Sequence, residues 1–444
     1  MSRIIRSPYA VVLFMAFILA SLLYDGAVEP ASAAGVTYFL SAAGSDTNSG
    51  TSSATPWKTL SKLNTAVLQP GDTVSLRKGD TFTGGLITGQ SGTTTAPITV
   101  NGYGTGAAPI ITGGKSGNCV RVNGNFTVVD GLRAVSCGYA GFSITGDRNT
   151  VQNSSASNNA AGIKIGTGSD FGKYAGNTLT DNNIENVNTQ GTNCGTAQAV
   201  NCSDDSGAFG ILINGNDNEV TANTISGSAA ASFDFVVDGG AIEVFNGNRN
   251  SVHHNIALDN NSFSELGRSS GTADGNTYRY NLVRSTCGTL CAQAKGFIAR
   301  GPSTSFGPTN STVFEFNTVY LTGPNSQAIV CHAQCPSTTV IRGNILAGVK
   351  NSLWINGSGW TEKENVFTGP INVTPSTTSR RVPTVGFVTT GTDFHLTATS
   401  AAVDLTSSTS SAVDLDGRPV PQDGNCNGTA TADAGAYEYD SPNC

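Results

Sequence analysis

The chain has 444 residues, of which 12% are charged and 54 are glycine, and its formal net charge is −7. The charged fraction is about half that of an ordinary globular domain. Because 38% of the residues are still hydrophobic, the composition excludes a disordered chain and indicates β-structure with many turns. The sequence contains no basic run, and we therefore expect no nucleic-acid partner.

The first 33 residues have the pattern of a secretory signal peptide. Arg3 and Arg6 precede an apolar run at residues 10–24, and Ala31-Ser32-Ala33 then offers small residues for cleavage. The apolar run, about 15 residues long, is shorter than the roughly 20 residues that a membrane-spanning helix requires. We expect residues 1–33 to be removed, the mature protein to be secreted, and no membrane span to remain.

Residues 34–72 are predicted to cap the N-terminal end of the fold. Apolar residues follow helical spacing from Trp57 to Val67, and a Pro-Gly-Asp turn follows them. We expect a helix over residues 56–68 that covers the first coil of a solenoid, because an uncapped solenoid exposes strand edges.

A short phrase recurs along residues 73–384, with an aliphatic or aromatic residue three positions before an asparagine. The predicted anchor residues are Asp130, Asn153, Asn182, Asn223, Asn255, Asn281, Asn317, Asn344 and Asn365. Asparagine suits the bends of stacked coils, because it tolerates the left-handed conformation and hydrogen-bonds to equivalent residues above and below. The phrase predicts an all-β fold, a right-handed parallel β-helix of about ten coils with loops of variable length inserted on one side. The repeat then fades, and residues 385–444 are predicted to form a C-terminal tail.

A second set of short strands lies between the anchors, with apolar residues at every second position. The predicted strands are residues 141–144, 162–165, 210–213, 241–244, 295–299, 328–331 and 352–355. The alternation directs Ile242 and Val244 inward and Glu243 outward, with Lys164 and Leu212 at outward positions of other coils. We expect the functional side chains on the outer surface of this sheet.

The ten cysteines agree with export to an oxidising compartment. The expected disulfides are Cys119–Cys137, Cys194–Cys202, Cys287–Cys291, Cys331–Cys335 and Cys426–Cys444. A zinc site is the alternative, since the spacing Cys-x3-Cys occurs twice, but the chain has only four histidines and no Cys-x2-Cys. We therefore favour disulfides.

Two parts of the chain resemble a known group of proteins. The N-terminal matches are Tyr38-Phe-Leu-Ser, Gly44-Ser-Asp-Thr-Asn-Ser-Gly50, Pro56-Trp-Lys-Thr-Leu60, Pro70-Gly-Asp-Thr-Val74 and Pro97-Ile-Thr-Val100. The C-terminal matches are Asp393-Phe-His-Leu396, Asp414-Leu-Asp-Gly417 and Asp433-Ala-Gly-Ala-Tyr-Glu438. Both resemble secreted bacterial right-handed β-helix proteins, which include pectate-lyase-like and alginate-lyase-like enzymes. The resemblance implies this fold and action on polysaccharide, but no single reaction, since the fold hosts several.

Acidic residues concentrate in the middle of the chain, around the predicted strand that carries Glu243. In β-elimination on a uronate, carboxylates hold Ca²⁺, which acidifies the proton that a basic side chain abstracts. The expected calcium ligands are Asp204, Asp205, Asp238 and Glu243. Lys295 is the expected base, and Arg300, at the end of the same strand, is expected to bind the acid group of the substrate. A calcium-assisted polysaccharide lyase is the function that we expect first.

Two alternatives remain open. A glycoside hydrolase needs two carboxylates that flank the scissile bond, and Glu265 follows Glu243 by 22 residues, about one coil, so these two with Asp238 are candidates for the pair. The other alternative is a non-catalytic glycan-binding or surface protein. For every alternative the expected partner is an extracellular polysaccharide, and the predicted substrate-binding residues are Lys164, His254, His332 and Trp354.

Overall fold

The structure is a computed structural model that describes residues 35–113, 117–194, 200, 206–233, 235–407 and 409–443. The predicted signal peptide lies outside these residues. From Val36 onward the chain forms one compact unit. Within the described part, no helix is both long and apolar enough to cross a membrane.

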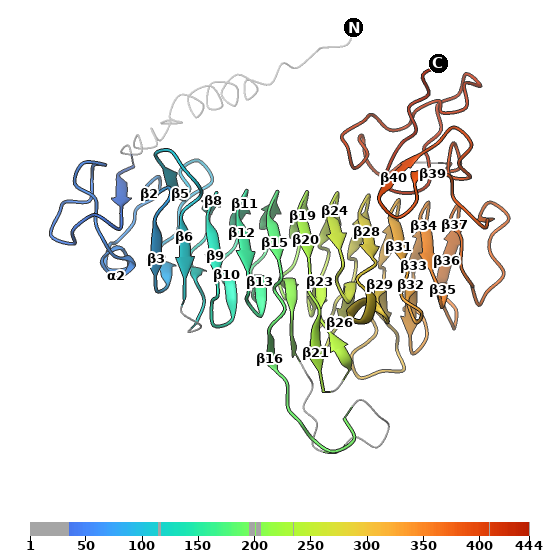
Figure 1. Cartoon of the computed structure of the whole chain (residues 1–444), viewed down its shortest axis with the longest axis horizontal. Helices are drawn as coiled ribbons and strands as arrows, with labels where there is room; N and C mark the ends of the chain where they lie inside the picture. The colour runs from blue at the N-terminus through green and yellow to red at the C-terminus, as the bar shows by residue number, and fades with distance from the viewer. Residues whose placement is uncertain are drawn as a thin grey trace, which may run out of the picture. The chain divides into compact units, whose positions relative to one another are not determined.

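Three long parallel sheets run along this unit (Figure 1), and each coil adds one strand to each sheet in the order A, B, C. Sheet A contains β1 (Thr37–Leu40), β2 (Thr73–Arg77), β5 (Ile98–Tyr103), β8 (Thr127–Asp130), β11 (Thr150–Gln152), β14 (Lys173–Ala175), β19 (Glu219–Thr221), β24 (Ser251–His253), β27 (Thr277–Arg279), β30 (Val313–Glu315), β33 (Thr339–Arg342) and β36 (Trp360–Lys363). Sheet B contains β3 (Thr81–Thr83), β6 (Ile110–Thr112), β9 (Arg133–Val135), β12 (Ser155–Ser157), β15 (Thr178–Thr180), β20 (Thr224–Ser226), β25 (Ile256–Leu258), β28 (Leu282–Ser285), β31 (Thr318–Leu321), β34 (Ile345–Gly348), β37 (Val366–Phe367) and β38 (Arg380–Arg381). Sheet C contains β4 (Leu86–Thr88), β7 (Val120–Val122), β10 (Ala140–Ile144), β13 (Ala161–Ile165), β18 (Phe209–Ile213), β23 (Gly240–Phe245), β26 (Ser262–Gly267), β29 (Lys295–Arg300), β32 (Gln327–His332) and β35 (Asn351–Trp354). The ten strands of sheet C confirm the predicted right-handed parallel β-helix of about ten coils.

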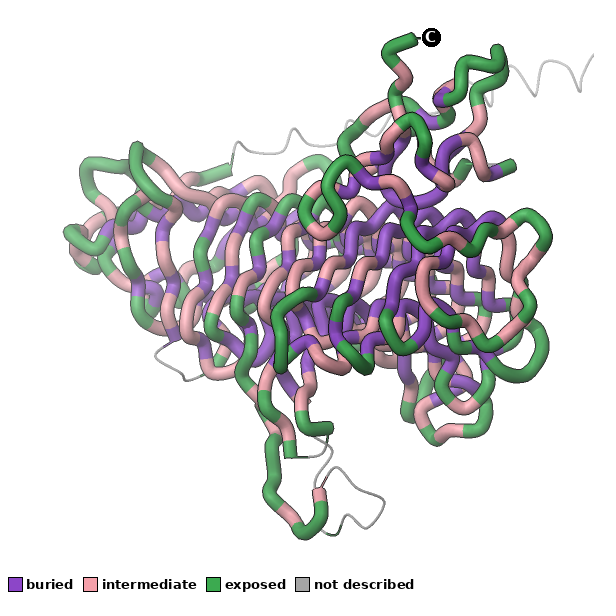
Figure 2. The backbone as a smooth tube through the Cα atoms, turned by 45° about the vertical axis from the view of Figure 1, so that its right-hand side comes forward, coloured by how far each residue is buried: buried purple, intermediate pink, exposed green. Residues whose placement is uncertain are grey.

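The core lies inside the coils, where apolar side chains from all three sheets meet. Ile242 and Val244 are fully buried, as the alternation predicts, and the same holds for Ile163 and Ile211 in neighbouring strands of sheet C. Figure 2 shows buried residues along the inside of the coils and exposed residues in the loops that leave them. The outward positions of the sheets are therefore free to carry polar side chains.

A ladder of asparagines stacks at the turn between sheets A and B. Each side chain amide donates to the side chain oxygen of the next member, and the members are Asn177, Asn223, Asn255, Asn281, Asn317, Asn344 and Asn365. All are buried, and each side-chain oxygen also accepts the backbone N–H of the member before it, which satisfies a polar group inside the turn.

Three of the predicted anchors, Asp130, Asn153 and Asn182, are wrong, because none of them belongs to this ladder. Asn182 lies in another column, where it accepts a hydrogen bond from Asn159 at 2.8 Å, and Asn153 is exposed and donates to Asp130 at 2.9 Å. The reason is that Asn177 and Asn182 flank the same short strand, β15, so both sit at buried turns with the same local pattern. The coil that ends at Asn223 is consequently 46 residues long rather than 41.

The N-terminal helix is much shorter than the predicted span of residues 56–68. It is a single turn, α2 (Leu60–Leu63), capped by the Thr59 side chain. Trp57 is extended instead, because it forms a parallel bridge to Leu40 at the edge of sheet A. The helix ends where the Asn64 side chain leaves it to bond to the backbone of Gly85 and Ile87.

The chain from Val385 folds back over the outside of sheet B. Its buried residues, including Phe394 and Tyr437, pack against Leu282 and Ile345 of β28 and β34. A short antiparallel pair, β39 (Phe387–Thr389) and β40 (Asp393–Leu396), lies in this tail. The segment therefore shares a hydrophobic cluster with the coils that it covers.

Disulfides are present at the predicted positions that the structure describes. The bridges are Cys119–Cys137, Cys287–Cys291 and Cys331–Cys335. Cys194 and Cys426 are also disulfide-bonded, while Cys202 and Cys444, their expected partners, lie outside the described residues.

Candidate functional site

The floor of the candidate site is a column of outward side chains on sheet C. Strand register places these residues directly beside one another, in the order Leu212, Glu243, Glu265, Ile298, Val330 and Trp354. Neighbouring members are one strand spacing apart, about 4.8 Å between backbones. Glu243 and Glu265 are thus direct neighbours, as the spacing of one coil predicts.

Loops turn this floor into a groove of about 580 Å³. On one side stand two hairpins inserted between sheets B and C, β16 (Glu185–Val187) with β17 (Ser206–Gly207) and β21 (Ala230–Ser232) with β22 (Val236–Asp238). They leave the coils together in Figure 1. Phe306, from the loop that follows β29, lines the groove as well.

The hairpins are tied to each other and to the floor. The Asn188 side chain donates to the Ala231 carbonyl oxygen at 2.9 Å and accepts the Phe233 N–H at 3.1 Å. Hairpin β21–β22 runs directly into β23, so Asp238 lies at the lip of the groove, five residues before Glu243. Backbone pairing with Ala230 therefore fixes the position of the Asp238 backbone at this lip.

Glu243 is half-buried among other acids. Burial raises its pKa well above the usual range, and the negative charges of Glu265 and Asp238 raise it further, while Arg300 opposes the shift. Glu243 is therefore the carboxyl group in the groove that keeps its proton to higher pH than an ordinary glutamate.

Glu265 has the opposite surroundings. Arg300 forms an ion pair with it, and the guanidinium carbon of Arg300 lies 5.7 Å from the ring centre of Phe306. His332 lies on the other side of Arg300, 3.4 Å away, and burial together with the charge of Arg300 lowers the pKa of His332. Glu265 therefore faces a cationic partner, whereas Glu243 faces other acids.

Lys295 lies at the start of β29, on the hairpin side of the floor. Its ammonium group donates to the Gln293 carbonyl oxygen at 2.7 Å. Burial, with a smaller contribution from the charge of Lys350, lowers the pKa of Lys295 to about 8. The ammonium group of Lys295 thus loses its proton more readily than that of an ordinary lysine, and it does so close to neutral pH.

The predicted substrate-binding residues divide into three groups. His332 lines the groove, and Trp354 is an exposed member of the floor column, 40% accessible. Lys164 is the member of the column beside Leu212, on the side away from Glu243, and its ammonium group lies 4.9 Å from the ring centre of Tyr139. His254 is outside the site.

The prediction that His254 binds substrate in the groove is wrong. This residue sits at a turn after β24, with a φ of 54°, and not in the groove. It bonds to the Val413 carbonyl oxygen at 3.1 Å and stacks on Tyr280 under the C-terminal tail. His253 is the last residue of β24 in sheet A, and its side chain contacts Glu219 of the neighbouring strand β19 at 3.1 Å. Alternation alone cannot show that a histidine at the end of a strand has left the strand for a turn.

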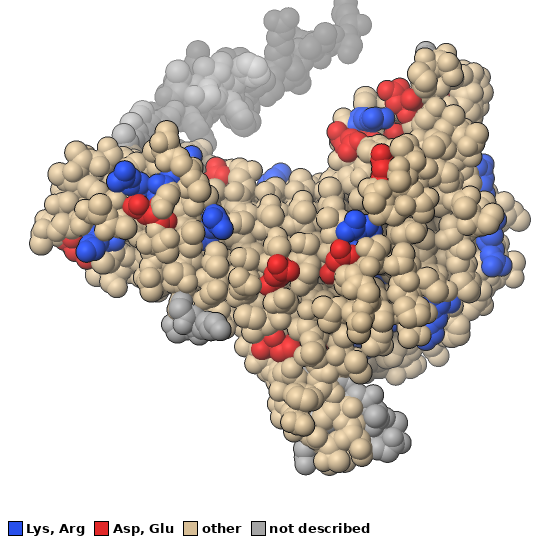
Figure 3. All heavy atoms as spheres, viewed as in Figure 1, with Lys and Arg blue, Asp and Glu red and all other residues tan. Residues whose placement is uncertain are grey.

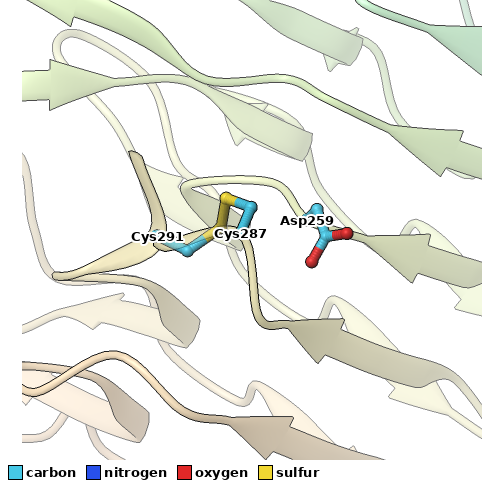
Figure 4. A group of neighbouring side chains, drawn as sticks. All are labelled: Asp259, Cys287 and Cys291. Atoms are coloured by element: carbon cyan, nitrogen blue, oxygen red, sulfur yellow. A yellow bond between two sulfur atoms is a disulfide. The ribbon is translucent and has the colours of Figure 1, made fainter. Parts of the chain in front are cut away.

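The expected calcium ligands are described only in part. Asp204 and Asp205 lie outside the described residues, and Asp238 and Glu243 line the groove. Within the described ranges, no three carboxylates of the groove have ligand atoms within 4.8 Å of one another. The group that meets this distance is Asp259 with Cys287 and Cys291, but Figure 4 shows these cysteines joined in a disulfide, so they have no thiolate to offer.

Apolar and amide side chains of the groove were not predicted. The aromatic members are Phe209, Phe235, Phe245 and Phe306, and the amides are Asn214, Asn261, Gln293 and Gln327. Phe245 lies two residues after Glu243 in the same strand, so strand alternation could have placed it on the outer face. Phe306 lies on a loop, where no such periodicity exists. Charges are sparse on the face seen in Figure 3, which shows no large area of one sign.

No family model matches the chain. A segment of 78 residues, 16% of the chain, is 42% identical to a curated lacto-N-biosidase of Bifidobacterium longum subsp. longum and covers 5% of it. The chain thus spans only a small part of this curated relative.

Solved structures with the same fold cover far more of the chain. Pectate lyase Pel9A has a TM-score of 0.58 and 15% identity, over 92% of this chain and 97% of that one. The GH136 lacto-N-biosidase of Eubacterium ramulus has a TM-score of 0.54 and 16% identity, over 76% of this chain and 64% of that one. An alginate lyase of Paenibacillus sp. has a TM-score of 0.50 and 16% identity, over 76% of this chain and 99% of that one. These similarities confirm the parallel β-helix fold.

Proposed function

We propose that this protein is a secreted enzyme that hydrolyses glycosidic bonds of an extracellular polysaccharide in the groove over sheet C. The observation that carries the proposal is the pair of neighbouring carboxyl groups in opposite environments. Glu243 has a raised pKa, and Glu265 is paired with Arg300. Two carboxyl groups whose surroundings separate their proton affinities are the usual equipment of a glycoside hydrolase.

In this proposal Glu243 is the general acid. It donates its proton to the glycosidic oxygen as the bond to the leaving sugar breaks. Glu265, paired with Arg300, is the nucleophile that attacks the anomeric carbon and forms a glycosyl-enzyme; water, deprotonated by Glu243, then hydrolyses this intermediate. Glu243 and Glu265 are direct neighbours on strands whose backbones lie about 4.8 Å apart. We therefore propose the retaining mechanism, which uses two carboxyl groups about 5 Å apart, rather than the inverting one, which needs a wider gap.

The comparisons support action on glycans without defining the reaction. The similar structures carry the names of a pectate lyase, an alginate lyase and a lacto-N-biosidase, two lyases and one biosidase. Secretion is supported by the N-terminal pattern and by the disulfides, which persist in oxidising compartments. N-terminal sequencing of exported protein that begins near residue 34 would support secretion, and retention of residues 1–33 would contradict it.

A calcium-assisted lyase is the second candidate, and Lys295 is the observation that favours it. A pKa of about 8 suits a general base, and this side chain lies in the same groove as the two glutamates. The oxygen donors of Asp238 and Glu243 fit calcium chemically, since Ca²⁺ prefers carboxylate ligands. When bound, the ion would neutralise the acid group of a uronate. The described residues by themselves supply fewer protein ligands than such an ion takes.

The experiment incubates the mature protein with a panel of neutral and uronic-acid polysaccharides. Reducing ends report both reactions, and ultraviolet absorbance of unsaturated uronates reports elimination alone. Hydrolysis predicts new reducing ends without new ultraviolet absorbance, and activity that EDTA does not reduce. Glu243→Gln and Glu265→Gln should each lower kcat by about 10²- to 10⁴-fold. Glu219→Gln, a partly exposed glutamate of sheet A, is the matched control and should change nothing.

Other outcomes reject the hydrolase. Elimination predicts unsaturated products, loss of activity in EDTA, and loss of activity in Lys295→Ala that calcium does not restore. Activity of the hydrolase should fall as pH rises through the raised pKa of Glu243, whereas proton abstraction by Lys295 should strengthen as pH rises through about 8. Absence of cleavage across the panel, with retained binding, would identify a glycan-binding protein instead.

A further inference from the structure

We infer that the glycan lies along the axis of the solenoid, and that Trp354 is a remote platform for one of its sugar rings. This inference rests on the proposed action on a glycan, and it deepens it by defining the direction and minimum length of the bound chain. Its support comes from the register of sheet C and not from the acid pair.

Trp354 points to solvent from the same column as the two glutamates. It pairs with Val330 in the register of β32 and β35. Its neighbours in the chain, Leu353 and Ile355, are fully buried, whereas Trp354 is 40% exposed. The ring of Trp354 stacks on no other described aromatic side chain, so core packing does not explain it.

An apolar floor connects the acid pair to this ring. Ile298 and Val330 fill the two positions of the column between Glu265 and Trp354, and both line the groove. Three strand spacings separate Glu265 from Trp354, about 14 Å between backbones. The apolar faces of sugar rings pack well on aliphatic and aromatic side chains, so a chain of several sugars fits this floor.

In the other direction the column continues through Leu212 to Lys164 and Ser143, and none of these residues is aromatic. Beyond Glu243 its next member is Leu212, which is only 8% exposed. Leu212 belongs to a small apolar cluster with Phe209, Ala140 and Ala161, on which Tyr139 packs. Because the exposed ring in this column is that of Trp354, we place the longer part of the glycan on the Trp354 side of the acid pair.

The test compares Trp354→Ala with Phe171→Ala. Phe171 is the matched control, an aromatic residue that is 51% exposed and lies under Arg148, between β13 and β14. Both variants should fold, because neither ring is in the core. With the polysaccharide that the panel shows to be cleaved, Trp354→Ala should lower kcat/KM about two- to tenfold for long oligomers. Disaccharides and trisaccharides should be cleaved as before, and Trp354→Phe should recover most of the loss.

Equal loss for short and long substrates, or no loss for either, would overturn the inference. A binding measurement separates this failure from failure of the proposed hydrolysis. Glu243→Gln and the double variant Glu243→Gln/Trp354→Ala are applied to an array of homogalacturonan, alginate, xylan and β-glucan oligomers of increasing length. Weaker binding of the double variant to long oligomers alone supports the platform, even if no bond is hydrolysed. Identical binding of the two proteins at every length rejects it, even if hydrolysis is established.

Discussion

The asparagine ladder makes a quantitative prediction at Asn255, in the middle of the solenoid. Its side-chain oxygen accepts the backbone N–H of Asn223 at 3.0 Å, and its side-chain amide donates to the Val220 carbonyl oxygen at 3.0 Å and to the next ladder member, Asn281. Asn255→Ala removes these bonds and leaves the Asn223 N–H without its acceptor and the Val220 carbonyl without this donor. Each buried group of this kind costs about 1–3 kcal/mol, so we expect a loss of about 4 kcal/mol.

The matching change in melting temperature follows from the size of the folded unit. An unfolding entropy of about 2.1 cal/mol/K per residue over about 400 residues gives roughly 0.8 kcal/mol/K, so a loss of about 4 kcal/mol lowers Tm by about 5 °C. Scanning calorimetry with circular dichroism measures the shift and checks that the β-structure is retained. Asn325→Ala is the control, since Asn325 is an exposed turn residue outside the ladder. Equal Tm values for the two variants would refute the reasoning.

Three further predictions concern stability. Burial, with the charges of neighbouring carboxylates, raises the pKa of Asp433 to about 7 and that of Glu438 to about 8. The folded tail therefore holds protons that the unfolded chain releases above about pH 4, so Tm should fall as pH rises from about 5 to 8, with a smaller slope in Glu438→Gln; an unchanged slope would contradict this. Replacing Cys119 and Cys137 by alanine opens a loop with a sequence separation of 18 and should cost about 3 kcal/mol, measured as a lower Tm, while an unaltered Tm would exclude the bridge. Gly210→Ala places a Cβ 2.4 Å from a backbone oxygen of the next coil and should cost about 1–3 kcal/mol of stability, measured as a lower Tm. An unchanged Tm would show that neighbouring coils can move apart without cost.

Local patterns predicted most of sheet C, because strand periodicity is a property of a few consecutive residues. The predicted strand at 241–244 is observed as β23, and the predicted approach of Glu265 to Glu243 is observed as direct pairing. The strand that carries Glu265, β26, was not predicted as a strand. Its inward Ser264 is polar and breaks the apolar alternation, and its hydroxyl is satisfied inside the core by Tyr278 at 2.9 Å.

The walls of the groove had no such local signal. Phe306 reaches the groove because of where the coil returns, and the position of hairpin β21–β22 depends on its bond network with Asn188. These placements follow from contacts between residues far apart in the chain. Sequence periodicity therefore located the carboxylates of the candidate site but not the aromatic residues around them.

The C-terminal tail covers an aromatic stack on the outside of the solenoid. Tyr280 stacks on Phe316 with ring centres 5.0 Å apart, and Val420 and Ala432 pack over both. The hydroxyl of Tyr280 also contacts Thr409 at 3.2 Å.

The segment that covers this stack follows all of the coils in the sequence, so the coils can form without it. Removing the segment would expose the rings of Tyr280 and Phe316 to solvent, and an exposed apolar surface of this kind favours association between molecules. The tail therefore shields the outside of the solenoid from contact with other molecules.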